Sequence, residues 1–105
     1  MISGANITTG IYKTPEFAIA VCVDAPNTRF PRHAHKACEY FIVLEGEMTV
    51  HYDDGQRFEL QRCDSHYVPV GVAHQPETVR GCRYLAITVP ASAFFPAGPA
   101  GLKKR

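Results

Sequence analysis

The sequence predicts an all-β fold, an antiparallel double-sheet barrel. Short runs rich in Val, Ile, Phe and Tyr alternate with turn signals along most of the chain, a pattern typical of sandwiches and barrels. Apolar residues rarely recur at the three-to-four-residue spacing of an amphipathic helix. Without helices to cross between strands, a parallel α/β fold is excluded. The length of 105 residues suits a single domain.

Turn chemistry separates the expected strands. Asp53-Asp54-Gly55 joins two of them as a hairpin, because Asp-Gly favours the tight turns that match strand twist. Glu45-Gly46 ends the strand before this hairpin, and Pro90 ends the last strand. The expected strands are residues 17–23, 39–44, 48–52, 57–60, 66–68 and 82–89.

The barrel is expected to occupy residues 1–90 as one domain. Residues 91–105 form a C-terminal tail rich in Ala, Pro and Gly, in which we expect no strand pairing. The side chains expected in the core are Phe41, Val43, Met48, Val50, Phe58, Leu60, Leu85 and Ile87.

Composition excludes several classes of function. The net charge of +1 argues against a nucleic-acid-binding surface. No apolar run is long enough to span a bilayer, so we expect no membrane partner. The N-terminus lacks the basic and apolar regions of a secretory signal, which predicts a cytoplasmic protein. The four cysteines should then be reduced thiols; Cys38 stands out because it adjoins Glu39.

One set of polar residues carries the candidate chemistry. His33, His35 and Glu39 share strand parity, so their side chains point to one face if the chain runs extended between them. His74 follows a turn and can reach the same place from a neighbouring strand. Three imidazoles and one carboxylate suit a first-row divalent metal. Taken singly, a histidine is usually a surface residue or a core residue with a hydrogen-bond partner, rather than a metal ligand.

The spacing of these residues resembles that of the two motifs of the cupin family. The first motif reads His33-x-His35, three residues, Glu39, six residues, Gly46. The second reads Pro69-x-Gly71, two residues, His74. With the short spacer between them, the motifs cover about half of the chain.

The sequence departs from the family pattern at three positions outside the four ligands. Asn27 and Cys63 stand where the motifs open with Gly, and Thr78 replaces a final Asn. Asn tolerates the left-handed region of backbone space. Cysteine does not, so we expect the turn before Asp64 to differ in type.

The resemblance implies a jelly-roll barrel that binds one divalent transition metal per chain (Mn, Fe, Ni or Zn) through His33, His35, Glu39 and His74. It leaves two classes of function open. One is a metal-dependent enzyme acting on a small organic molecule by oxygenase, isomerase or lyase chemistry. The other is a non-catalytic module that binds or senses a small ligand such as a sugar. His66 has a parity that can aim it into the barrel, toward such a ligand.

The resemblance and the need to cover exposed strand edges also predict a homodimer. We expect the strand at residues 17–23 and the Phe94-Phe95 pair in the tail to make the contacts.

Overall fold

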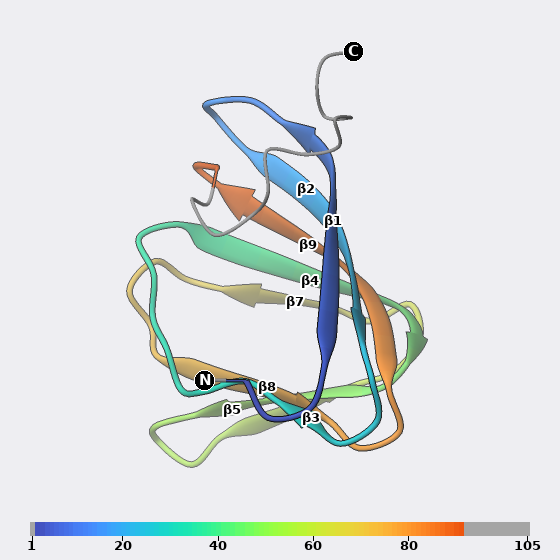
Figure 1. The fold of residues 1–105 in the computed structure, drawn as a ribbon. Helices are drawn as coiled ribbons and strands as arrows, with labels where there is room; N and C mark the ends of the chain where they lie inside the picture. Colours follow the sequence, from blue (N-terminus) through green and yellow to red (C-terminus); the bar gives the residue numbers. More distant parts are fainter. Residues whose placement is uncertain (1, 92–105) are drawn as a thin grey trace.

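The computed structural model describes residues 2–91, which form an all-β barrel of nine strands (Figure 1). No helix occurs among these residues, and so none that could cross a membrane. The strands are β1 (Asn6–Lys13), β2 (Ala18–Asp24), β3 (Thr28–Arg29), β4 (Cys38–Gly46), β5 (Met48–Tyr52), β6 (Arg57–Leu60), β7 (Ser65–Val68), β8 (His74–Thr78) and β9 (Cys82–Val89).

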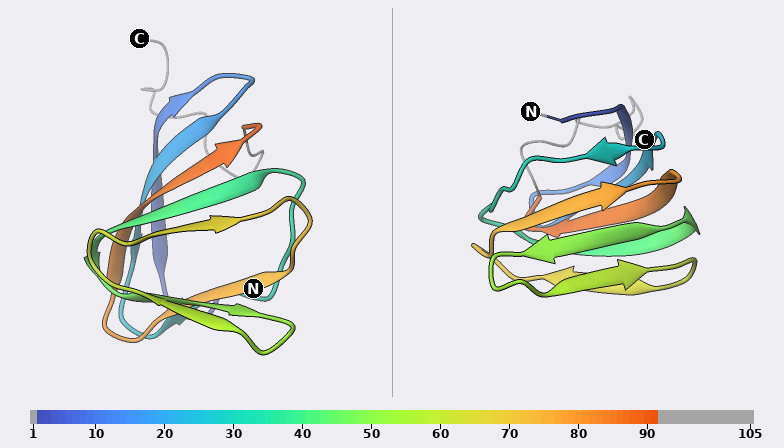
Figure 2. Two further views of the ribbon diagram at one scale, coloured as in Figure 1. Left: turned by 180° about the vertical axis from the view of Figure 1, so that it is seen from behind. Right: turned by 90° about the horizontal axis from the view of Figure 1, so that it is seen from below.

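Two antiparallel sheets face each other across the core (Figure 2). The larger sheet has the order β1-β2-β9-β4-β7, and the smaller has the order β3-β8-β5-β6. Their inner faces meet over a cluster of buried side chains: Ala20, Cys22, Phe41, Val43, Met48, Val50, Leu60, Val68, Cys82, Tyr84 and Ala86. The fold is the double-sheet barrel that the sequence predicts.

Strand alternation decides which side chains enter this core. Along β9, Tyr84, Ala86 and Thr88 are buried, whereas Leu85 and Ile87 point outward and are only half-buried. The prediction that Leu85 and Ile87 belong to the core is therefore wrong, as it is for Phe58, which is 40 % exposed. In a strand of consecutive apolar residues, hydrophobicity alone does not tell the inner from the outer face.

Three strands escaped prediction, and each lacks a clear alternating pattern. β1 carries Gly10 and a register shift after it, and β3 is only two residues long. β8 contains Pro76, a residue that normally argues against an inner strand. Pro76 is tolerated because it lies beyond the end of the neighbouring strand β3, which stops at Arg29. The Pro76 carbonyl still accepts a hydrogen bond on that side, from Phe30 N at 3.0 Å.

Three motif positions adopt a left-handed backbone conformation. Gly46 has φ +84°, and a Cβ at this position would lie 2.0 Å from the carbonyl oxygen of Gly81, so the first motif ends in Gly for both conformational and steric reasons. Cys63 has φ 75°. The expectation that cysteine would avoid positive φ there is wrong, because the tight connection between β6 and β7 imposes it. Asn27 has φ 62°, as its side chain tolerates.

Residue 1 and residues 92–105 lie outside the described part of the chain. Phe94 and Phe95, expected at a dimer contact, fall in this range.

Candidate metal centre

An extended segment, residues 30–37, carries the first two histidines from the smaller sheet to the larger one. It leaves β3 and enters β4, so it crosses one end of the barrel (Figure 1). His33 pairs with His74 through two backbone hydrogen bonds, N to O at 3.0 Å and 2.9 Å. Directly paired residues project to the same side of a ladder. Their rings therefore lie 4.4 Å apart, and His35, two residues along, places its ring 5.6 Å from that of His33.

Each of the three imidazoles is oriented in the same way. Nδ1 of His33 donates to Pro31 O at 2.8 Å, Nδ1 of His35 to Ala37 O at 2.7 Å, and Nδ1 of His74 to Val72 O at 2.8 Å. A backbone carbonyl can only accept, so the proton resides on Nδ1 in all three rings. In the neutral imidazole, Nε2 then carries the lone pair, and this is the form in which histidine binds a metal.

The ring nitrogens converge on one spot. One nitrogen from each of His33, His35 and His74 lies within 4.8 Å of the others. His74 is fully buried, and its Nε2 has no hydrogen-bond partner among the residues that the structure describes. A buried polar atom without a partner costs about 1–3 kcal/mol. A divalent cation bound by these three nitrogens would remove that cost, so the donor set fits a metal.

Glu39 lies beside this cluster on β4. Its Oε1 is 3.1 Å from His35 Nε2 and 3.8 Å from His74 Nε2. The carboxylate is 8 % exposed, and a buried negative charge needs a compensating partner. At 3.1 Å, the oxygen and the ring nitrogen of His35 must share either a proton or a cation. All four predicted ligands are thus together, with Glu39 at the edge of the three-histidine group.

The electrostatics of the site favour neutral His33 and charged Glu39. Burial, helped by the neighbouring imidazoles, lowers the pKa of His33 below 6.5. The hydrogen bond with Glu39 raises the pKa of His35 above 6.5 against the opposing effect of burial. For Glu39, burial raises the pKa, but His35 and His74 outweigh it, and the pKa falls below 4.5. A proton on His35 therefore stands in for a cation beside the carboxylate.

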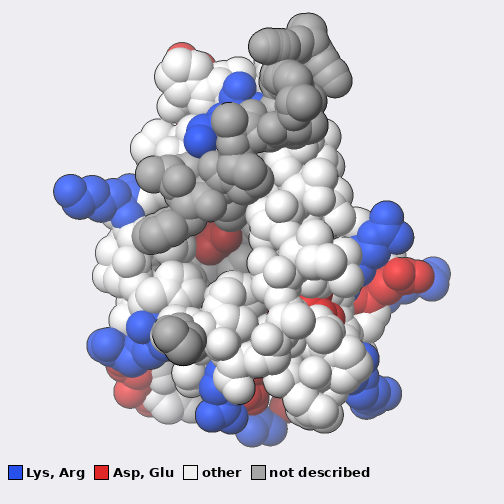
Figure 3. All heavy atoms as spheres, viewed as in Figure 1, with Lys and Arg blue, Asp and Glu red and all other residues white. Residues whose placement is uncertain are grey.

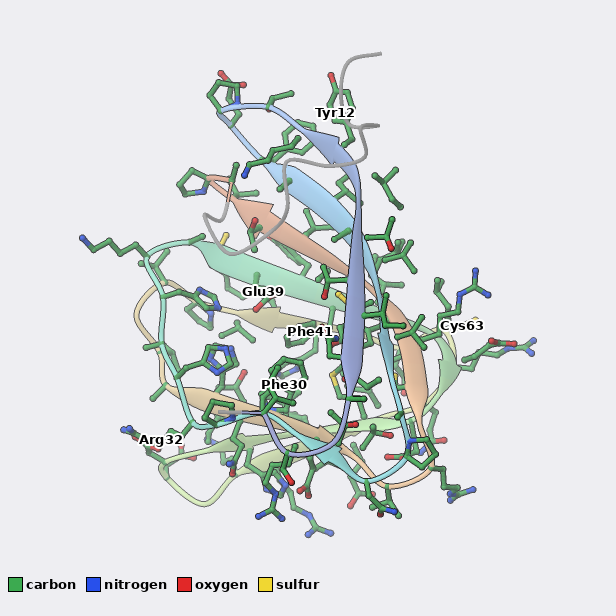
Figure 4. The ribbon with its side chains drawn as sticks, viewed as in Figure 1. Tyr12, Phe30, Arg32, Glu39, Phe41 and Cys63 are labelled. Carbon is green, nitrogen blue, oxygen red and sulfur yellow. The ribbon has the colours of Figure 1, made fainter. Side chains whose placement is uncertain are left out.

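The cluster opens into a cavity of about 410 Å³. Figure 4 shows Phe30, Glu39 and Phe41 directed into the space between the sheets, and Figure 3 shows a hollow on this side with acidic atoms inside it. The described lining is mostly apolar, and its charged or titratable side chains are two of the histidines, Glu39, Cys22 and Tyr84. It includes Ile2, Asn6, Thr8, Cys22, Phe30, Pro31, His33, Ala34, His35, Glu39, Phe41, Pro76, Tyr84, Ala86 and Thr88.

The cations nearest in sequence do not line this cavity. Arg32 points away from it and pairs with Asp53 in the β5–β6 turn, Nε to Oδ1 at 2.6 Å (Figure 4). This ion pair is fully exposed, and it ties the histidine-bearing segment to the smaller sheet.

Other residues singled out in the sequence lie elsewhere. His66 accepts from or donates to Tyr52 Oη at 2.6 Å and lies against Phe58; it is not part of the described lining. Cys38 has the opposite parity to Glu39 and points away from the site. The cysteine in the lining is Cys22 instead, and burial raises the pKa of its thiol to about 11, so it is a neutral, unreactive group at pH 7.

Sequence reasoning missed the inner wall of the cavity. Asn6, Thr8 and Tyr84 lie there, and Thr8 Oγ1 donates to Asn6 Oδ1 at 2.8 Å while Asn6 Nδ2 donates to the buried Asp24 at 2.6 Å. The alternation of polar residues in Asn6–Thr8 was the available signal.

The protein is a small two-sheet β-barrel with an inward-facing candidate metal centre. Three histidines and a glutamate form this centre at one end of the barrel interior. The family profile described as the cupin domain matches residues 20–88, and the chain belongs to the cupin family. No curated protein matches the sequence significantly.

Solved structures agree with the fold. An RmlC-like cupin from Shewanella frigidimarina has a TM-score of 0.80 at 24 % identity, over 87 % of this chain and 81 % of its own. KdgF from a Halomonas species has a TM-score of 0.78 at 14 % identity, over 84 % and 81 %. A putative ethanolamine utilization protein from Salmonella typhimurium has a TM-score of 0.75 at 22 % identity, over 84 % and 72 %. At these identities the likeness concerns the fold alone.

Proposed function

We propose that this cupin binds one divalent transition metal per chain through His33, His35, Glu39 and His74, and acts as an enzyme on a small organic molecule. The observation that carries the proposal is the buried His74 Nε2, which lacks a hydrogen-bond partner within residues 2–91 and faces the other two histidines. Manganese, iron, nickel and zinc all accept such a set of nitrogen and oxygen donors.

The protein's own residues supply binding and orientation. Three backbone carbonyls hold the imidazoles in one tautomer, so the donor atoms are fixed before a metal arrives. A metal in this site supplies Lewis acidity toward an oxygen atom of the ligand. Phe30 and Phe41 line the cavity with apolar surface, which limits water and strengthens electrostatic interactions inside.

The cavity favours a small and largely apolar ligand with an oxygen donor. Neither Lys nor Arg occurs among the described lining residues, and Glu39 adds a negative charge. A phosphate-bearing ligand normally meets cationic side chains or a helix N-terminus. A volume near 410 Å³ is within the range of sites for small molecules.

The proposal is tested first by metal content. We expect about one metal per chain in wild-type protein after calorimetric titration with Mn²⁺, Fe²⁺, Ni²⁺ or Zn²⁺, and loss of tight binding in His35→Ala and His74→Ala. His51→Ala is the matched control, because His51 faces outward and pairs with Glu77 at 2.8 Å. Equal metal content in the wild type and His74→Ala would refute the site. Zinc found in recombinant material would not identify the native metal, because zinc binds such sites more tightly than iron or manganese.

Catalysis is tested separately. The metal-loaded protein is offered small carbonyl, enol and phenol compounds, with oxygen uptake and product formation followed by electrode and NMR. Turnover that requires the metal supports the enzyme, whereas saturable binding without turnover across the panel would favour a non-catalytic binding module.

A further inference from the structure

The inner face of the larger sheet changes in character with distance from the candidate metal centre. The strand registers align its inward side chains in rows, and Glu39 shares the first row with Thr88 on β9. The second row joins three small residues to one aromatic residue: Gly10, Ala20, Ala86 and Phe41. Small side chains in the middle of a sheet leave space above them, and the cavity lies over this row.

The far end of the cavity is polar on the side of β1, the edge strand of the sheet (Figure 1). In the third row, Thr8 pairs with Cys22, which pairs with Tyr84, and all three line the cavity. Asn6, one row further along β1, completes this end of the lining. Tyr84 is two rows from Glu39, and two rows of two residues each span about 13 Å along the strands. The candidate metal centre and this polar wall therefore lie at opposite ends of one cavity.

The hydrogen bonds behind the polar wall have a fixed direction. Asp24 is 3 % exposed and lies outside the described lining. An ionised carboxylate only accepts, so Asn6 turns its Nδ2 toward Asp24 Oδ1, at 2.6 Å. Asn6 Oδ1 consequently faces Thr8 and accepts from Thr8 Oγ1 at 2.8 Å.

This direction makes the Thr8 hydroxyl an acceptor toward the cavity. A hydroxyl group has one proton and two lone pairs, and the proton of Thr8 is used by Asn6. The other contact of the hydroxyl, 3.6 Å to Cys22 Sγ, is with a weak hydrogen-bonding group. A ligand that meets Thr8 Oγ1 must therefore bring its own donor.

We propose that Thr8 is a specificity-determining residue, which selects ligands that carry a hydroxyl group at the end remote from the metal. The inference rests on the proposed function, because the metal centre holds the other end of the ligand. The substrate class is then an alcohol or phenol with an apolar body and a metal-binding oxygen opposite the hydroxyl.

Charged groups fit the polar wall less well than a hydroxyl. A carboxylate would direct its lone pairs at those of Thr8, and the described lining contains no Lys or Arg to neutralise it. An ammonium group would need a carboxylate in contact, but Asn6 lies between Asp24 and Thr8. Burying an unpaired ion costs far more than burying a neutral group that forms its hydrogen bond.

The middle of the cavity suits a flat apolar body. Phe30 and Phe41 are directed into it (Figure 4), and Pro76 and Ala86 complete this part of the lining. Phe41 also packs against the edge of Tyr84, with ring centroids 5.7 Å apart. Aromatic side chains arranged in this way favour an aromatic ring in the ligand.

The test compares two probes by calorimetric titration of the zinc-loaded, full-length protein. Phenylpropanoate and para-hydroxyphenylpropanoate share a carboxylate for the metal and a ring, and differ in one hydroxyl group. Zinc has no redox chemistry, so binding is measured without oxidation. The hydroxylated probe should bind about 3- to 10-fold more tightly, as expected for one hydrogen bond. A third probe, para-carboxyphenylpropanoate, should bind more weakly than both.

Variants at position 8 assign the preference to Thr8. Thr8→Val removes the hydroxyl but keeps the branched shape, so the preference for the hydroxylated probe should fall to about 1-fold. Thr8→Ser restores a hydroxyl and should restore the preference. The matched control is Thr9→Val, because Thr9 is the next residue on β1 and is exposed on the opposite side. Metal content and the affinity for phenylpropanoate should stay unchanged in all three variants, which a general disturbance of the fold would not allow.

Loss of the preference in Thr8→Val, with its retention in Thr8→Ser and Thr9→Val, supports the proposal. Equal affinity of the wild type for the first two probes would overturn it, and so would a preference that Thr8→Val retains or the failure of both probes to bind. The metal site is judged separately by chelation. If chelation leaves the affinity for both probes unchanged, the proposed metal site is wrong, and the position-8 variants still measure the contact with the hydroxyl.

Discussion

Metal binding should stabilise this protein most at neutral to alkaline pH and least in acid. The physical reason is the His35–Glu39 contact at 3.1 Å, which holds a proton where a cation could sit. Protons and metal compete for neutral imidazoles, so the metal must displace whatever proton His35 carries. Because the pKa of His35 is raised above 6.5, this competition begins above pH 6.5. His33, with a lowered pKa, competes only below that value.

The magnitude follows from linkage. Metal at 100 times its dissociation constant at pH 7.5 stabilises the fold by about 2.7 kcal/mol. In a domain of this size, that corresponds to a rise in Tm of roughly 10–20 °C. Each displaced proton weakens the apparent affinity tenfold per pH unit, about 1.4 kcal/mol. Over the pH range in which His35 is protonated in the metal-free protein, the one displaced proton therefore reduces the gap by about 1.4 kcal/mol, half of its starting value, for a fall of one pH unit.

The metal-free protein should behave in the opposite way. His35 has a raised pKa, so its contribution to stability is fully present below pH 6.5 and is lost as the pH rises through the folded-state pKa. Glu39 has a lowered pKa, so its contribution is present above pH 4.5 and is lost as the pH falls through the folded-state pKa. The protonated His35 and ionised Glu39 thus stabilise the metal-free fold most in mild acid.

Differential scanning calorimetry from pH 5 to 8, with metal or with chelator, measures both curves. Glu39→Gln should shift the proton competition to lower pH, because His35 loses the carboxylate that raises its pKa. His51→Ala should leave both curves in place. A metal-induced rise in Tm that is absent at pH 7.5, or one that does not vary with pH, would refute the four-ligand site.

Three further predictions concern stability away from the metal centre. Gly46→Ala should lower the free energy of unfolding by more than about 3 kcal/mol, because the new Cβ would meet the Gly81 carbonyl. Gly55→Ala should lower it only by the backbone strain of about 1–2 kcal/mol, since Gly55 has φ +88° and open space around it. Urea unfolding compares the two variants. Cys63→Gly should stabilise the fold by up to about 1 kcal/mol by relieving positive φ, and an unchanged midpoint would mean that the cysteine is unstrained. Asp24→Asn should raise Tm at pH 7 but not near pH 3. Burial raises the pKa of Asp24 despite hydrogen bonds from Asn6 and Tyr84, so the ionised carboxylate destabilises the fold relative to the protonated form. A Tm difference that persists in acid would contradict this.

The sequence predicted the barrel because its turns are explicit. Asp53-Asp54-Gly55 and Pro69-Val70-Gly71 occur where the structure has turns, and the β5–β6 hairpin has the expected bounds. The wrong assignment of Leu85 and Ile87 to the core has one cause. β9 is apolar at nearly every position, so its two faces differ by side-chain size and partners rather than by polarity. Periodicity therefore could not place Leu85 and Ile87, which depend on what covers the outer face.

The four predicted ligands come together, but by a route that strand parity did not describe. His33 and His35 lie on an extended crossing segment, and Glu39 follows a bend on a strand of the other sheet. The backbone pairing of His33 with His74 does the positioning instead. Such a bridge between residues 41 positions apart is a tertiary feature, which one sequence shows only through motif spacing. The assignment of these residues as metal ligands stays a prediction.

The candidate site lowers the stability of the metal-free fold, although the fold holds its side chains in place. His74 Nε2 is buried next to the Glu39 carboxylate and has no hydrogen-bond partner in the described part of the chain, which is unfavourable; an apolar residue at position 74 would pack there at lower cost. The surrounding structure nevertheless fixes this arrangement, since backbone carbonyls accept from all three rings and two backbone hydrogen bonds pair His33 with His74. A fold that maintains an unfavourable arrangement beside an internal cavity concentrates the energetic cost where a ligand can relieve it.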